Sequence, residues 1–158
     1  MIRKRSRAVL GGIFFLACLW SLLPAQTSPN AQTCQGSTVD AQGEEIAEKS
    51  RAFLAQLQTA VSGDDKNKVA SMISYPLLVI RGARKSRIRT KPQFLEHYDN
   101  IFDPHVHHAI AQQSAKCLFG NYQGTMIGDG EIWYREQANG KMKIVTVNPT
   151  AGMESTSH

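Results

Sequence analysis

The sequence predicts an α+β fold in which a curved antiparallel sheet wraps, like a cone, around helices from the N-terminal and central parts of the chain. Residues 44–63 and 64–76 show the helical spacing of apolar residues. The stretch 124–147, GTMIGDGEIWYREQANGKMKIVTV, has two runs rich in Ile, Val, Met, Trp and Tyr on either side of Asn139-Gly140. Asn-Gly between such runs is typical of a hairpin, because both residues tolerate a positive φ.

Glycines inside the first arm of this hairpin predict its curvature. Gly128-Asp129-Gly130 interrupts the arm, and glycine within a strand pattern usually marks a bulge or a bend. A curved sheet has a concave face that other elements must fill. We expect the helices that come earlier in the chain to fill it.

The chain begins with a predicted secretory signal peptide, residues 1–25. Residues 1–7 carry four basic side chains, residues 8–23 are almost wholly apolar, and the small residue Ala25 follows. A retained membrane anchor is the alternative, because the apolar run is longer than a usual signal core. Lipidation at Cys18 is a third interpretation. We therefore expect a periplasmic or secreted protein that meets the membrane only if the leader is retained.

Removal of residues 1–25 changes the charge of the chain. The whole chain has 18 Lys and Arg, 13 Asp and Glu, and a net charge of +5. Four of those basic residues and no acidic residue lie in the leader, so the mature chain has a net charge of +1. The basic character of the whole chain therefore gives no reason to expect a nucleic-acid partner.

The next segment, residues 26–43, is predicted to be a flexible lead that precedes a single domain at residues 44–149. After the leader is removed, Cys34 and Cys117 are the remaining cysteines. Two cysteines in an exported protein favour a disulfide between them. The alternative is two separate thiols, with Cys117 acting as a small buried apolar residue.

Two helices open the domain. Glu44 to Gly63 places Phe53, Leu54, Leu57 and Val61 on one face, and Gly63 ends this helix. Asp64 and Asp65 cap a shorter helix, which Tyr75-Pro76 is expected to close.

Two strands follow. Leu77–Ile80 is an apolar run of strand length, and Arg84–Arg89 is its expected partner across a short turn at Gly82. Six basic residues fall between Arg81 and Lys91 with no acidic residue among them. A nucleic-acid or anionic-lipid patch is one reading of this run. A solvated edge hairpin that its charges protect from aggregation is the favoured one.

The remaining elements complete the sheet. Thr90, Pro92 and Gln93 form a helix start, and Asp103-Pro104 ends that helix and begins another through Ile110. A strand at 116–119 and a turn at 120–124 are expected before the hairpin. Residues 150–158 are small and polar and are expected to form a disordered tail.

The helix start TKPQFLEHYD, the ribbon GTMIGDGEIWY with KIVTVN after it, and the order of elements resemble the nuclear-transport-factor-2-like superfamily, the cystatin-like α+β cone. The resemblance covers roughly residues 44–148 and includes ketosteroid isomerase and scytalone dehydratase among the relatives. It implies a pocket at the open end of the cone. Because one fold carries many functions, the side chains must decide the activity.

Four residues are candidates for lining such a pocket: Tyr98, Asp99, Asp129 and Trp133. An isomerase of this kind requires a carboxylate base in an apolar pocket, for which Asp99 and Asp129 are the candidates, and a donor such as Tyr98 or Tyr134. No motif supports these catalytic assignments. The favoured interpretation is that these residues have structural roles. Trp133 and Tyr134 are expected on opposite faces of one strand.

The histidines at 105–108 are the one group with metal-ligand chemistry. On a helix, His105 and His108 would share a face, and Asp103 could add a carboxylate to a Zn²⁺ or Cu²⁺ site. No spacing matches a known zinc motif, so solvent-exposed histidines are the favoured reading.

The sequence therefore predicts a small exported module that binds a small hydrophobic ligand or a protein partner, without catalysis or a cofactor. The first alternative is an isomerase or dehydratase that uses Asp99 or Asp129. The second is a structural module that forms a homodimer through its sheet.

Overall fold

The computed structural model describes residues 47–151 of the chain. The leader at 1–25 and the whole predicted lead at 26–43, including Cys34, lie outside this range. The signal peptide, export and the Cys34–Cys117 bridge therefore stay predictions. None of the helices that the structure describes combines the length and apolar character needed to cross a membrane.

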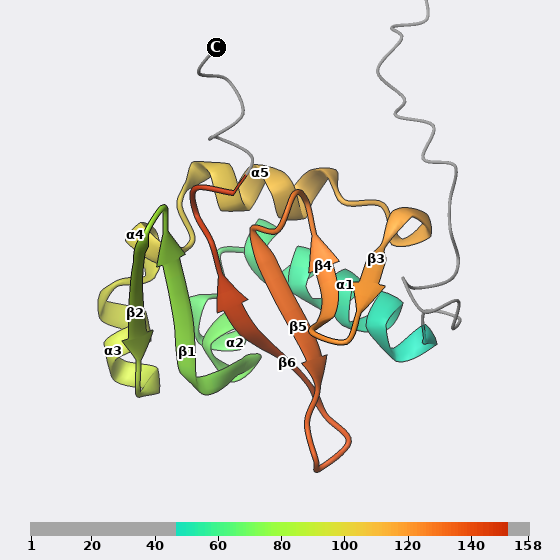
Figure 1. The fold of residues 1–158 in the computed structure, drawn as a ribbon, viewed down its shortest axis with the longest axis horizontal. Coiled ribbons are helices and arrows are strands. Elements are labelled where there is room, and N and C mark those ends of the chain that lie inside the picture. The colour runs from blue at the N-terminus through green and yellow to red at the C-terminus, as the bar shows by residue number, and fades with distance from the viewer. Residues whose placement is uncertain (1–46, 152–158) are drawn as a thin grey trace, which may run out of the picture. The chain divides into compact units, whose positions relative to one another are not determined.

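The predicted α+β class is confirmed (Figure 1). The helices are α1 (Glu48–Ser62), α2 (Lys66–Ser71), α3 (Lys91–Glu96), α4 (Tyr98–Ile101), α5 (Pro104–Gln112) and the 3-10 turn η1 (Ala115–Cys117). The strands are β1 (Ile73–Arg81), β2 (Arg84–Ile88), β3 (Phe119–Asn121), β4 (Gly124–Ile127), β5 (Ile132–Glu136) and β6 (Met142–Val147). They form one open sheet in the order β2-β1-β6-β5-β4-β3, with β2 and β3 at its edges.

The prediction of a wholly antiparallel sheet was wrong, because β1 and β6 are parallel. Strands joined by short turns are antiparallel. This holds for β1 with β2, and for β3 with β4, β4 with β5 and β5 with β6. A long connection through the helices α3 to α5 and four further strands, β2 to β5, separates β1 from β6. Its path decides their relative direction, and no local sequence signal reports that path.

The Asn139-Gly140 hairpin is confirmed, but the bend expected at residues 128–130 is a turn. Gly140 has a φ of 75°, and β5 and β6 pair on either side of it. Gly128 and Gly130 have φ values of 65° and 111°, and they reverse the chain between β4 and β5, which pair with each other. The predicted long first arm is therefore two strands.

The helix starts follow the predicted caps. The side chain of Asp65 accepts a hydrogen bond from the Lys68 N–H, and that of Thr90 accepts one from the Gln93 N–H. The Gln93 side chain accepts from the Arg89 N–H. These bonds satisfy N–H groups that have no partner within the helix.

The second helix is shorter than predicted. It ends at Ser71, and β1 already begins at Ile73, so Tyr75-Pro76 lies inside a strand. The register of β1 with β6 shifts between Ile73 and Leu78. Because proline has no N–H to donate to a neighbouring strand, an irregular ladder around Pro76 is expected.

The core lies between the sheet and the helices. One row of cross-strand neighbours, Ile127, Ile132, Val147 and Val79, is at most 2% exposed. From the helices, Leu54, Leu57 and Phe94 are fully buried against this side. In Figure 1, α1, α2 and α5 lie behind the sheet. The sheet therefore has one covered face and one face without helices among the described residues.

The chain remains ordered beyond the predicted end of the domain at residue 149. The Thr150 hydroxyl accepts a hydrogen bond from the Gly82 N–H at 2.9 Å, and Ala151 is 7% exposed. The prediction of a disordered tail from residue 150 was therefore wrong for these two residues.

Candidate functional site

A groove of about 1060 Å³ lies between α1 and α5, which we call the α1–α5 groove. It is lined by Ala55, Gln58, Thr59, Val61, Ser62, Asp99, Phe102, Pro104, His107, His108, Ile110 and Ala111. Most of its surface is apolar, although six of the twelve lining residues have polar or charged side chains. This composition is typical of sites for small organic molecules.

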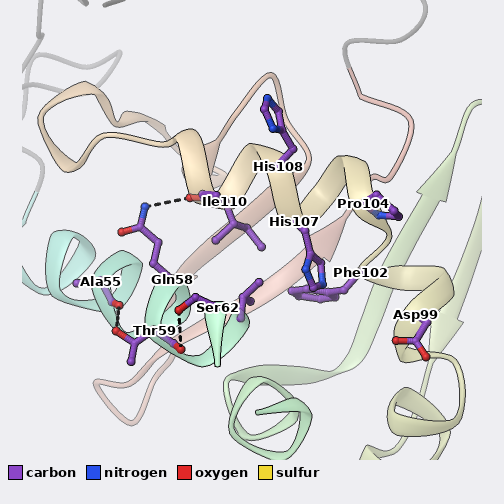
Figure 2. Close-up of a pocket in the computed structure, with 12 residues that line it drawn as sticks. Ala55, Gln58, Thr59, Ser62, Asp99, Phe102, Pro104, His107, His108 and Ile110 are labelled. Atoms are coloured by element: carbon purple, nitrogen blue, oxygen red, sulfur yellow. Dashed lines mark hydrogen bonds between the residues drawn. The ribbon is translucent and has the colours of Figure 1, made fainter. Parts of the chain in front are cut away.

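Gln58 fixes one end of the groove. Its side-chain amide nitrogen donates hydrogen bonds of 2.9 Å to the backbone oxygens of Ile110 and Gln113 (Figure 2). These oxygens belong to the last turn of α5, where backbone acceptors lack partners within the helix. The amide therefore holds α5 against α1 and sets the spacing of the groove walls.

His107 is the polar side chain that points into this region. Figure 2 shows it directed from α5 toward Phe102, whereas His108 projects the other way. Its ring lies edge-on to Phe102 and Tyr98, with centroid distances of 6.4 and 6.2 Å. The Nε2 atom of His107 is buried and has no hydrogen-bond partner, and the same is true of the Tyr98 hydroxyl.

Two unpartnered polar atoms on neighbouring rings are unusual. A buried polar group without a hydrogen bond costs about 1 to 3 kcal/mol, so most such groups in proteins find partners. Burial raises the pKa of Tyr98 to about 12, and the nearby charges of Asp64 and Asp99 add to the rise. At neutral pH Tyr98 is therefore a hydrogen-bond donor without an acceptor.

Asp99 lies at the edge of the groove and is solvated. Its carboxylate accepts a hydrogen bond from Lys66 Nζ at 2.7 Å, and its side chain is 82% exposed. The hydrogen bond raises the pKa of Lys66, whose ammonium also lies 5.0 Å from the centre of the Tyr98 ring. Asp99 thus anchors a cation over the buried aromatic ring.

The four predicted ligand-binding residues do not form one site. Tyr98 is 1% exposed and packs in the helical layer, and Asp99 is at the groove edge. Asp129 is exposed in the β4–β5 turn. Trp133 lines a different groove, on the uncovered face of the sheet. Neither carboxylate has the apolar surroundings that an isomerase base requires.

The predicted metal ligands also point apart. The Asp103 carboxylate accepts the Val106 N–H at 3.0 Å as the cap of α5, and His108 is exposed. His105 Nε2 lies 2.9 Å from both Glu131 Oε1 and the Ala151 oxygen. Among residues 47–151, no group of three or more His, Cys, Asp or Glu side chains is placed to hold a metal ion.

Sequence reasoning missed Glu131, a buried carboxylate. Its side chain is 4% exposed, its Oε1 atom lies 2.9 Å from His105 Nε2, and its carboxylate accepts a hydrogen bond from the Asp129 N–H at 2.6 Å. A side chain at Gly128 would overlap this carboxylate. The two glycines of the turn are the one signal that could have indicated it. The arrangement ties α5, the β4–β5 turn and the Ala151 segment together.

The groove can therefore bind a molecule, but it does not assemble a catalytic set. It offers apolar walls, one buried imidazole nitrogen and a peripheral ion pair. Comparison of the chain with protein-family models, with curated proteins and with solved structures finds no match.

Proposed function

We propose that this protein is a small exported module that binds a mainly hydrophobic ligand in the α1–α5 groove and performs no catalysis. The observation that carries the proposal is the unpartnered Nε2 atom of His107 in a groove of about 1060 Å³. Because Nε2 is buried in the free protein, the His107 ring must shift on binding for a ligand hydroxyl or carbonyl group to supply the missing partner. The apolar part of the ligand then contacts the groove beside Val61, Phe102 and Ile110. Satisfying a buried polar atom adds to the hydrophobic contribution.

The proposal includes membership of the nuclear-transport-factor-2-like superfamily and its cone-like wrapping. The order of elements and the single sheet with helices on one face support this assignment. The predicted leader at residues 1–25 supports export. The mass of the protein recovered from an expressing bacterium tests the leader, because cleavage after Ala25 removes the first 25 residues.

The isomerase or dehydratase alternative loses its main support, because Asp99 and Asp129 are both exposed to solvent. The buried acid, Glu131, accepts a hydrogen bond from the Asp129 N–H, lies next to His105 and does not line the α1–α5 groove. A general base must reach the proton that it removes. A binding role is therefore the better conclusion.

Thermal-shift screening tests the binding proposal. The panel contains sterols, aromatic alcohols and acyl alcohols, each with one or two polar groups on an apolar body. We expect at least one compound to raise Tm in a concentration-dependent manner, since a ligand that binds only the folded state stabilises it.

Two variants place the ligand. Ala55→Phe puts a ring into the groove from an exposed position of α1 and should abolish the shift, and His107→Leu should reduce it. Ala52→Phe is the matched control, because Ala52 is exposed on the same helix but does not line the groove. The proposal would be contradicted if no compound raised Tm, or if Ala55→Phe left the ligand-induced rise in Tm unchanged.

A further inference from the structure

The uncovered face of the sheet carries a second groove, of about 650 Å³, which we call the outer-face groove. The helices α1, α2 and α5 lie on the other side of the sheet in Figure 1. The two large apolar side chains that are exposed within residues 47–151, Phe119 (44%) and Tyr122 (84%), belong to this side. Phe119 contacts Trp133 edge-to-face at 6.5 Å, and Tyr122 lines the groove itself.

One row of cross-strand neighbours runs over this face from edge to edge. The pairings of the six strands place in line Arg87, Leu78, Thr146, Trp133, Met126 and Phe119. With strands about 4.8 Å apart, the row is about 24 Å long. The row begins at the cation Arg87 at one edge of the sheet and ends at Phe119 at the other, and the Phe119 ring contacts Trp133.

The charges of the groove have one sign. Its charged lining residues are Lys85, Arg87 and Arg135, and no Asp or Glu lines it. None of the three cations takes part in an ion pair with another described residue. Cations beside an apolar floor favour a ligand that has a negative group joined to an apolar body.

We propose that the outer-face groove binds a free, single-chain anionic amphiphile of the fatty-acid carboxylate type. The carboxylate lies at Arg87 and Lys85, and the chain runs along the row over Leu78 and Trp133 toward Phe119. Arg is suited to this role because its planar guanidinium binds a carboxylate through two hydrogen bonds. The inference concerns the face opposite the α1–α5 groove and does not rest on the function proposed for that groove.

The shape and charge of the face favour this occupant over two others. Four residues of the row, Arg87, Leu78, Thr146 and Trp133, line the hollow, which one chain can reach and the flat surface of a bilayer cannot. In a homodimer formed through this face, the cations of both copies would be buried without an acidic partner, which is costly. A single carboxylate at one end of the row avoids both problems.

Tryptophan fluorescence tests the proposal on the chain without the predicted leader. The full sequence contains two tryptophans, and Trp20 lies in the leader, so Trp133 is the reporter after residues 1–25 are removed. Titration with dodecanoate below its micelle concentration should shift the Trp133 emission to the blue and reach saturation. Dodecyltrimethylammonium, which has the same chain and the opposite charge, should bind at least about tenfold more weakly, because the cations repel it.

Variants in the edge strand β2 distinguish binding at the outer-face groove from a nonspecific effect of positive charge. Arg87→Gln and Lys85→Gln should each weaken dodecanoate binding about tenfold, which corresponds to the loss of one charge-assisted hydrogen bond. Arg84→Gln should leave it unchanged, because Arg84 is exposed on the same strand but alternates to the other face. Circular dichroism confirms that each variant is folded.

Four results would overturn the proposal. They are equal binding of the two detergents, equal weakening by Arg84→Gln, a response to phosphatidylglycerol vesicles without one to dodecanoate, and light scattering that shows a dimer in which Trp133 is already buried. The vesicle result would assign the face to a membrane surface, and the dimer result to a second copy of the chain.

Discussion

Tyr134 joins the sheet to α1 through both parts of its side chain. Its hydroxyl donates a hydrogen bond of 3.0 Å to the backbone oxygen of Ser50, and its ring stacks on Phe53 at 4.8 Å. The residue is fully buried, and burial raises the pKa of its hydroxyl. A tyrosine buried at this depth usually has a partner for its hydroxyl, and here the partner belongs to the first turn of a helix.

Tyr134→Phe should therefore lower the free energy of unfolding by about 1 kcal/mol, because the ring contact remains and the hydrogen bond is lost. Urea unfolding at neutral pH measures the difference. Tyr122→Phe is the control, since Tyr122 is 84% exposed and its substitution should have no effect. Equal stability of the two variants would show that the bond to Ser50 contributes nothing.

At the residue scale, alternation along a strand was predictable and burial of a charge was not. Trp133 and Tyr134 do lie on opposite faces, as their adjacency in β5 requires. The buried Glu131 carboxylate has two neighbours: the Asp129 N–H, two residues away in the β4–β5 turn, and His105, which comes from α5. From the sequence alone, a carboxylate is predicted to be exposed to water, because burial of an unpaired charge is costly.

At the scale of elements, α5 forms one wall of the α1–α5 groove and begins at a single cap. The Asp103 carboxylate accepts the Val106 N–H at 3.0 Å, and Pro104 follows in the first turn. Proline fits there because its missing N–H has no role at that position. The helix has nine residues, so one end contact is a large share of its local stability.

Asp103→Ala should destabilise the protein by about 1 kcal/mol and loosen α5 at the end near His107. Hydrogen exchange of the α5 amides, together with urea unfolding, measures both effects. Asp129→Ala is the control: Asp129 is exposed, and its carboxylate makes no hydrogen bond with the described residues. Faster exchange across the whole chain, without a local effect in α5, would contradict this role of Asp103.

Elements with local signals were predictable, and elements placed by distant contacts were not. The Asn139-Gly140 turn and the caps at Asp65, Thr90 and Asp103 are set by residues next to one another. The glycines at 128 and 130 are compatible with a bend within one strand or with a turn between two strands. Because β4 and β5 pair with each other, the glycines form a turn. The parallel contact of β1 with β6 depends on the path of the intervening chain.

At the scale of the whole molecule, the sheet separates two surfaces of different chemistry. The helical side holds a groove lined by His107, whose Nε2 atom is buried and unpartnered, and the outer side holds cations and exposed aromatic rings. The sequence predicted one pocket inside a cone and assigned Tyr98 and Trp133 to it. The α+β class was predictable from periodicity, but the division of these residues between two faces depends on which side of the sheet the helices cover.

The buried tyrosines of the helical layer make the whole fold sensitive to alkaline pH. Burial raises the pKa of Tyr98 to about 12, whereas the ordinary value, which applies to the unfolded chain, is 10. Between about pH 10 and 12 the folded state therefore holds a proton that the unfolded state releases. Stability is fully present below pH 10 and falls as pH rises, by about 1.4 kcal/mol per pH unit for one such tyrosine.

Tyr98→Phe tests this linkage and the missing partner of Tyr98 at once. At neutral pH the substitution should leave stability unchanged or raise it, because it removes a hydroxyl that has no hydrogen bond. Between about pH 10 and 12 the variant should lose stability less steeply than the unsubstituted protein, since one raised pKa is gone. Urea unfolding across this pH range measures the slope, and Tyr122→Phe, at an exposed position, should keep the original slope. A marked loss of stability in Tyr98→Phe at neutral pH would mean that the hydroxyl has a partner in solution, and His107 would then be the first residue to test for that contact.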